Sequence, residues 1–191
     1  MKFDVIIIGG GLAGVTAATA LQREGRRCAI VSAGLSPHKV DLREFRKDGG
    51  TVLAGDAVTG GIIQVGRLLC VYTGKLGDTP LEADHFILAT GKYFSRGLSS
   101  DMDRIYETIF GLDVEYAADP ADWFAPGFHN SQPFMQFGVK SEGGCALKDG
   151  VRIANLYPVG EILAGIDGSD EDADARITGS ALEAVRIIKG E

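Results

Sequence analysis

The sequence predicts an α/β fold of three layers: a largely parallel sheet, helices on one face and a β-meander on the other. Three observations lead to this prediction. The chain opens with an apolar strand, a glycine-rich turn and a helix; its middle holds short strands at hairpin spacing; and a late apolar strand precedes a terminal helix. This order is typical of a Rossmann-like, FAD/NAD(P)-binding domain.

The first strand and helix carry the clearest signal. Residues 5–8 form the continuous β-branched run of a strand buried on both faces. Gly9, Gly11 and Gly14 have the G-x-G-x-x-G spacing, and residues 12–23 have the apolar period of a helix packed on a sheet. The backbone amides at the start of such a helix bind phosphate. We therefore expect a pyrophosphate site at the turn, formed by Gly9, Gly10, Gly11, Leu12, Ala13 and Gly14.

The second strand, "RRCAIVS", ends at Ser32, where Asp or Glu usually binds the adenosine ribose. A serine hydroxyl can make the same contact more weakly, so Ser32, Ala33 and Gly34 are expected at the ribose. No arginine follows directly to take a 2′-phosphate, which argues against NADP. His38 follows the strand closely enough to touch the adenosine half, and the backbone of Val58 is expected at the adenine.

The middle of the chain predicts a short helix at 40–47, a strand at 51–59 and a meander of short strands. Its return strand, residues 85–90, runs into Thr90 and Gly91, which we expect to line the pocket.

The last part distinguishes between cofactors. A strand at 155–159 precedes Gly160 and Glu161, which resemble the second FAD motif of flavoproteins, where a carboxylate binds a ribityl hydroxyl. A helix is predicted at 178–189, with its N-terminus near Gly179 and Ser180 directed at the flavin. Simple NAD domains lack these features, so FAD is the predicted cofactor. FMN is less suitable, because a mononucleotide has no use for a pyrophosphate turn.

Composition excludes several other classes. The 191 residues carry a formal net charge of −7, which argues against a nucleic-acid partner. No apolar run approaches the ~20 residues that span a bilayer, and three scattered cysteines suit a reducing cytoplasm. The acidic run 170–174 has alternate aspartates, but a calcium loop would need Gly and Glu where Ala175 and Ala181 stand. A solvated loop is the preferred interpretation, and no metal site is expected.

The chain also resembles a known family. Five phrases occur in order: "ILATGKYFSRGL", "IFGLDVEY", "DWFAPGF", "QPFMQFGV" and "NLYPVGEILAGID". Together they are similar to the flavin-binding B subunit of anaerobic glycerol-3-phosphate dehydrogenase. The resemblance implies a redox flavoprotein that joins a catalytic partner. It also implies an iron–sulfur protein in the same complex that passes electrons to membrane quinones, which would place the chain at the periphery of the inner membrane.

Two departures from that family bear on catalysis. Family members carry a large segment after the second strand, whereas here "VSAGLSPHK" passes almost directly into "VDLREFRKDGG". Near the end, "DGSDEDADARITGS" replaces a glycine-rich turn. No residue stands out as a general acid or base. The alternative is therefore a non-catalytic cofactor-binding or assembly module that has lost its substrate domain.

We expect residues 1–191 to form one FAD-binding domain, with a small lobe inserted at 92–150. Five aromatic residues in this lobe are interpreted as its core, with an exposed docking patch as the alternative: Trp123, Phe124, Phe128, Phe134 and Phe137. The oligomeric state is left open, and a homo-oligomer is one alternative.

Overall fold

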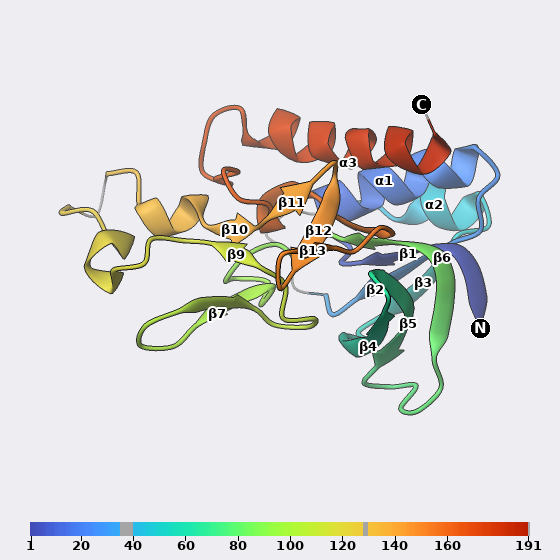
Figure 1. The fold of residues 1–191 in the computed structure, drawn as a ribbon. Coiled ribbons are helices and arrows are strands. Elements are labelled where there is room, and N and C mark those ends of the chain that lie inside the picture. The colour runs from blue at the N-terminus through green and yellow to red at the C-terminus, as the bar shows by residue number, and fades with distance from the viewer. Residues whose placement is uncertain (35–39, 128–129, 191) are drawn as a thin grey trace.

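The computed structural model describes residues 1–34, 40–127 and 130–190. It has the predicted layers: a seven-stranded sheet whose parallel part has helices above it and whose last strands form a β-meander below, as Figure 1 shows. The lobe extends to one side of these layers, and both termini lie at the opposite end (Figure 1).

The parallel part of the sheet has the order β3-β2-β1-β6, with β14 on the far side of β6. Its strands are β1 (Lys2–Ile8), β2 (Cys28–Ser32), β3 (Thr51–Ala54), β6 (Leu81–Leu88) and β14 (Leu156–Pro158). The predicted strand at 5–8 lies within β1, whose Val5 to Ile8 pair with Cys28 to Val31. Their side chains are buried on both faces, as the continuous β-branched run requires.

The meander consists of β4 (Val58–Gln64), β5 (Arg67–Thr73) and the first residues of β6, paired antiparallel. The single strand expected at 51–59 is two strands, β3 and β4. Between them Gly55 has φ +66° and Asp56 is buried, and the Asp56 carboxylate accepts hydrogen bonds from the Thr73 hydroxyl and the Lys75 amide. This network turns the chain out of the parallel sheet and into the meander.

Three helices cover the upper face: α1 (Leu12–Arg23), α2 (Arg43–Lys47) and α3 (Ala173–Lys189). Helix α1 has the predicted bounds, whereas α2 is shorter than the helix expected at 40–47. The side chains of α1 and α3 pack with the sheet around Val5, Ile7 and Ile30 in one apolar cluster. This packing fixes the start of α1 over the carboxyl ends of β1 and β2.

The lobe segment has little regular structure. It holds β7 (Leu98–Ser100), β8 (Ile105–Glu107), β9 (Val114–Glu115), η1 (Pro120–Trp123), η2 (Pro133–Gln136), β10 (Gly138–Val139), β11 (Ser141–Glu142) and β12 (Cys145–Lys148), and β13 (Val151–Arg152) follows it. Its buried side chains share a cluster with residues on the lower face of the sheet. Trp123 and Phe137 are buried there, which confirms the core interpretation for these two, whereas Phe124 is 64% exposed. Phe128 lies outside the described residues.

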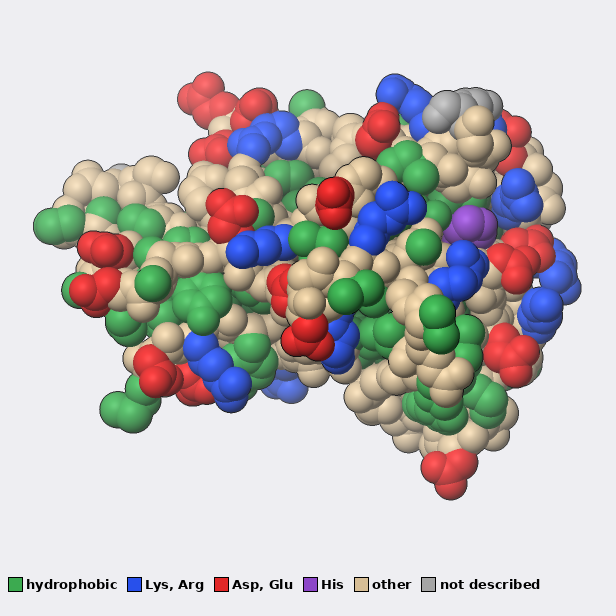
Figure 2. All heavy atoms as spheres, viewed as in Figure 1, with side chains coloured by type: hydrophobic (Ala, Val, Ile, Leu, Met, Phe, Trp, Pro, Cys, Tyr) green, Lys and Arg blue, Asp and Glu red, His purple; other side chains and the backbone are tan. Residues whose placement is uncertain are grey.

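The surface carries charges of both signs. On the face shown in Figure 2, Lys and Arg are interspersed with Asp and Glu, and hydrophobic side chains gather on the lobe and the meander. Within the described residues, no helix has the length and apolarity needed to cross a membrane. The same residues contain no group of three or more His, Cys, Asp or Glu that could hold a metal ion.

Candidate functional site

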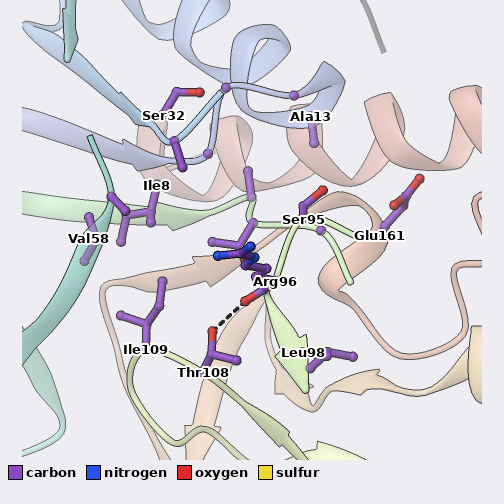
Figure 3. A pocket seen from close by; sticks show the side chains of 18 of the residues that line it. Ile8, Ala13, Ser32, Val58, Ser95, Arg96, Leu98, Thr108, Ile109 and Glu161 are labelled. Carbon is purple, nitrogen blue, oxygen red and sulfur yellow. Dashed lines mark hydrogen bonds between the residues drawn. The ribbon is translucent and has the colours of Figure 1, made fainter. Parts of the chain in front are cut away.

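A cavity of about 740 Å³ lies where β1, β2 and β6 end. The carboxyl ends of parallel strands meet at this edge, which is where α/β sheets bind ligands. The lobe closes the cavity from below, and Figure 3 shows Val58 and Glu161 at opposite ends of it. The lining includes eleven of the predicted residues: Gly9, Gly10, Gly11, Leu12, Ala13, Ser32, Ala33, Val58, Thr90, Gly91 and Glu161. Gly14, Gly34, Gly160, Gly179 and Ser180 do not line it, and His38 lies outside the described residues.

The glycine turn closes one wall of the cavity with backbone alone. Gly9 has φ +114°, and a Cβ there would lie 2.1 Å from the Ala89 carbonyl oxygen. Gly14 lets α1 approach the turn, because a Cβ there would lie 2.1 Å from the Gly9 carbonyl oxygen. Helix α1 begins after Gly11 with no side-chain cap and no acidic residue in its first turn. Its first amides and its dipole therefore favour an anion.

Ser32 stands at the end of β2, beside the turn. A Cβ on Gly10 would lie 2.7 Å from Ser32 Oγ, so the hydroxyl is adjacent to the glycine turn. The same hydroxyl accepts a hydrogen bond from the Gly34 amide over 3.3 Å. Val58 is buried at the start of β4 and Ala33 is exposed. These residues form the end of the cavity that the sequence assigns to adenosine.

Thr90, Gly91 and Glu161 form the other end. The Thr90 hydroxyl oxygen is buried and has no hydrogen-bond partner among the described residues, a condition that usually signals an external partner. Gly91 has φ +67°, and a Cβ there would meet the Ser95 side chain at 3.1 Å. Glu161 lies in η3 (Gly160–Ile162), half-buried, with its carboxylate against Gly168. Gly160 has φ +72° and packs against Ala13, so it supports α1 from outside the cavity.

The expected start of the last helix was wrong. Helix α3 begins at Ala173, so Gly179 and Ser180 lie inside it and not at its N-terminus. The buried side chains of Ala173 and Ile177 extend the apolar face of the helix toward its start, through part of the acidic run expected as a loop. Gly179 is exposed, and the Ser180 hydroxyl accepts a hydrogen bond from the Gly160 amide over 2.8 Å. In place of these two residues, α3 contributes Ile177 to the cavity.

The sequence interpretation also missed the lobe wall of the cavity. Tyr93, Ser95 and Arg96 follow Gly91, and residues from β7, β8 and the turn after it complete the wall: Leu98, Ser99, Tyr106, Thr108 and Ile109. The signal in the sequence is weak. Only the position of "KYFSRG" directly after a pocket-lining Gly91 could have indicated it.

Lys92 is a buried ammonium next to Gly91. Its side chain donates hydrogen bonds to the Ile166 carbonyl over 2.6 Å and to the Met135 carbonyl, which ties the lobe to the segment after η3. Burial lowers the pKa of Lys92 from 10.5 to about 8, and the carboxylates of Asp167 and Glu161 offset only part of this effect. The buried amine is therefore deprotonated more readily than a surface lysine.

This shift predicts a pH dependence of stability. Between about pH 8 and pH 10.5 the unfolded chain holds the Lys92 proton and the folded chain releases it, so folding stability rises with pH across this window. Between pH 7 and pH 10.5 the free energy of unfolding of the wild type should rise by about 3 kcal/mol relative to that of Lys92→Met. Urea unfolding of both proteins at intervals over this range measures the gain. A constant difference between the two proteins would contradict the assignment.

Comparison with known sequences identifies similar proteins. The sequence model of the FAD binding domain family matches residues 4–38 and 34–173. The B subunit of anaerobic glycerol-3-phosphate dehydrogenase from Yersinia pestis is 34% identical over 158 residues, which is 81% of this chain and 37% of that protein. Its counterpart from Vibrio cholerae is 41% identical over 128 residues, 65% of this chain and 29% of that protein. The matched regions thus span about a third of the length of these curated relatives.

Solved structures share the fold. An oxidoreductase from Agrobacterium tumefaciens aligns over 100% of this chain and 98% of its own, with a TM-score of 0.56 and 16% identity. A thioredoxin reductase from Gloeobacter violaceus aligns over 98% of this chain and 94% of its own, with a TM-score of 0.57 and 13% identity. At these identities the likeness concerns the fold alone.

Proposed function

Because this chain belongs to the FAD-binding domain family, we propose that it carries FAD in the cavity between the strand ends and the lobe, and that it exchanges electrons through this cofactor. FAD supplies hydride and single-electron transfer when bound. The observation that carries the proposal is the continuous cavity from Ser32 and Val58, past the glycine turn, to Glu161. Its volume of about 740 Å³ lies within the usual range for small-molecule and cofactor sites.

The proposed contacts follow the order of groups along FAD. Ser32, Ala33 and the backbone of Val58 are assigned to adenosine, with Gly34 as an outer contact, and the assignment of His38 to the same half rests on its place in the sequence. The turn from Gly9 to Gly14 is assigned to the pyrophosphate, and Glu161 to the ribityl chain, with Gly160 behind it. Thr90 and Gly91 are assigned to the flavin end, where the unpartnered Thr90 hydroxyl provides one hydrogen bond. Gly179 and Ser180 are assigned no direct contact with FAD. Ser180 supports the site only through its hydrogen bond from the Gly160 amide.

The relatives support a finer proposal: a role like that of the B subunit of anaerobic glycerol-3-phosphate dehydrogenase, with glycerol 3-phosphate as the electron source. A catalytic subunit and an iron–sulfur subunit are the proposed partners, and they would hold the protein at the membrane. A homo-oligomer is the alternative assembly. The two matched segments overlap at residues 34–38, and the proposed departure from that family lies in the same stretch.

Absorbance spectroscopy of the purified protein tests FAD binding. We expect the apoprotein to take up one equivalent of FAD and to show flavin bands. Denaturation should then release FAD and not FMN. A protein that stays colourless after incubation with excess FAD would refute the proposal.

Anaerobic reduction tests the redox role. If glycerol 3-phosphate bleaches the bound flavin, the chain catalyses the reaction by itself. If bleaching requires the catalytic subunit, an electron-transfer role is supported. If dithionite reduces the flavin but neither glycerol 3-phosphate condition does, the chain is a non-catalytic cofactor-binding module.

A further inference from the structure

Arg96 is the one cation that lines the cavity among the described residues. Within that part of the chain the only other charged lining residue is Glu161. Figure 3 shows Arg96 in the middle of the cavity, between Ile8 and Val58 on one side and Ser95 and Glu161 on the other. The guanidinium is exposed and makes no hydrogen bond or ion pair with any described residue. It is therefore available to a ligand that enters the cavity.

The backbone at Arg96 is held in a conformation that arginine seldom adopts. Its φ is +63°, in the left-handed region, which glycine or asparagine would occupy at lower cost. Two hydrogen bonds hold this conformation: the Arg96 amide donates to the Tyr93 carbonyl over 3.1 Å, and the Thr108 hydroxyl donates to the Arg96 carbonyl over 2.7 Å. The turn that carries Thr108 is itself fixed, because the buried Glu107 carboxylate accepts hydrogen bonds from the backbone amides of Ile109 and Phe110.

In an acidic chain a local cation strengthens the binding of a phosphate ligand. The formal net charge is −7, and among the described residues on the strand side of the cavity only the backbone amides at the start of α1 favour an anion. A guanidinium donates two parallel hydrogen bonds to a phosphate and adds a full positive charge to the partial charge of the helix terminus.

We propose that Arg96 binds a phosphate group in the cavity from the lobe side, and that this group belongs to the pyrophosphate of the bound dinucleotide. The inference rests on the proposed function, since it assigns a residue to the same cavity. It adds a part of the site that lies 82 residues beyond the glycine motif in the chain. The cofactor would thereby hold the lobe against the sheet through a charged contact.

The test compares Arg96→Gln with wild type in titrations of the apoprotein with FAD, ADP and riboflavin at low salt. Affinity for FAD and ADP should fall about ten- to a hundredfold, as expected for a lost charge-assisted hydrogen bond. Riboflavin affinity should not change, because riboflavin carries no phosphate. Arg96→Lys should recover part of the loss. Arg186→Gln, on the exposed face of α3, removes an equal charge away from the cavity and should behave as wild type.

Arg96→Gly separates binding from folding. Glycine suits the positive φ, so this variant should unfold at a higher temperature than wild type and still bind FAD more weakly. If Arg96→Gln leaves FAD and ADP affinity unchanged but abolishes a spectral response of the FAD-loaded protein to glycerol 3-phosphate, the phosphate belongs to a separate ester and the pyrophosphate assignment is overturned. If neither response changes, Arg96 binds no phosphate and the whole proposal is overturned. A wild type that binds no FAD would instead refute the proposed function.

Discussion

Replacing Gly9 with alanine should abolish measurable FAD binding and destabilise the fold by roughly 3 kcal/mol or more. Gly9 has φ +114°, and a Cβ there would lie 2.1 Å from the carbonyl oxygen and 2.6 Å from the carbonyl carbon of Ala89. Both atoms belong to backbone. They cannot move away freely, because the Ala89 amide donates to the Ile8 carbonyl over 2.8 Å and Ile8 pairs with Leu88 in the sheet.

FAD titration and urea unfolding of Gly9→Ala measure the two effects. Gly25→Ala is the matched control, because Gly25 also has a positive φ, +79°, but a Cβ there would have no neighbour within 4 Å. This control should lose only about 1 kcal/mol and retain wild-type affinity for FAD. A folded Gly9→Ala protein that binds FAD within about threefold of wild type, a difference below 1 kcal/mol, would mean that the turn is not the pyrophosphate site.

The features that the sequence predicted well depend on residues close together in the chain. Helix α1 begins and ends where expected, since Gly9, Gly11 and Gly14 all lie within one strand–turn–helix unit. The choice of FAD over NAD depended on the order of later strands, and membership of the FAD-binding domain family confirms it. The bounds of α1 follow from a pattern of neighbouring residues, and the choice of FAD follows from the order of such patterns along the chain.

The features that were missed depend on contacts between distant residues. The break between β3 and β4 arises from the bond between Asp56 and Thr73, which no local propensity encodes. Helix α3 starts early because Ala173 and Ile177 meet the core. The lobe wall was missed for the same reason, since Arg96 before β7 takes its position from Thr108 after the paired strand β8.

A second large effect is expected at Asn155, where the sheet divides. Strand β6 pairs with β5 through Leu81 and Glu82, and then with β14 from Phe86 onward. Asn155 is buried beside this division, 1% exposed. Its side-chain oxygen accepts from the Leu68 amide over 2.9 Å, and its nitrogen donates to the carbonyls of Leu68 and Asp84 over 2.8 and 3.0 Å. One amide side chain thus satisfies three backbone groups.

Substituting Asn155→Leu removes all three bonds and leaves the amide and the carbonyl of Leu68 buried without this partner, while the Asp84 carbonyl keeps a hydrogen bond from Arg67. At about 1–3 kcal/mol for each unsatisfied group, we expect a loss of about 4 kcal/mol and a fall in Tm of roughly 10 °C. FAD affinity should fall as well, because β14 leads directly to Val159 and Glu161 in the cavity wall. Urea unfolding and thermal unfolding monitored by circular dichroism measure the stability loss.

Asn155→Asp has the same shape and separates hydrogen bonding from packing. The variant keeps the hydrogen bond from the Leu68 amide. It replaces the side-chain nitrogen, which donates to the carbonyls of Leu68 and Asp84, with a carboxylate oxygen that cannot donate. Burial and these carbonyls should raise the pKa of the new carboxyl group in the folded state. The folded protein then holds a proton that the unfolded chain releases. The free energy of unfolding of the variant should therefore approach that of wild type as pH falls from 7 toward 5. If both variants stay within 1 kcal/mol of wild type at neutral pH, Asn155 does not join the meander to the cofactor-binding part of the sheet.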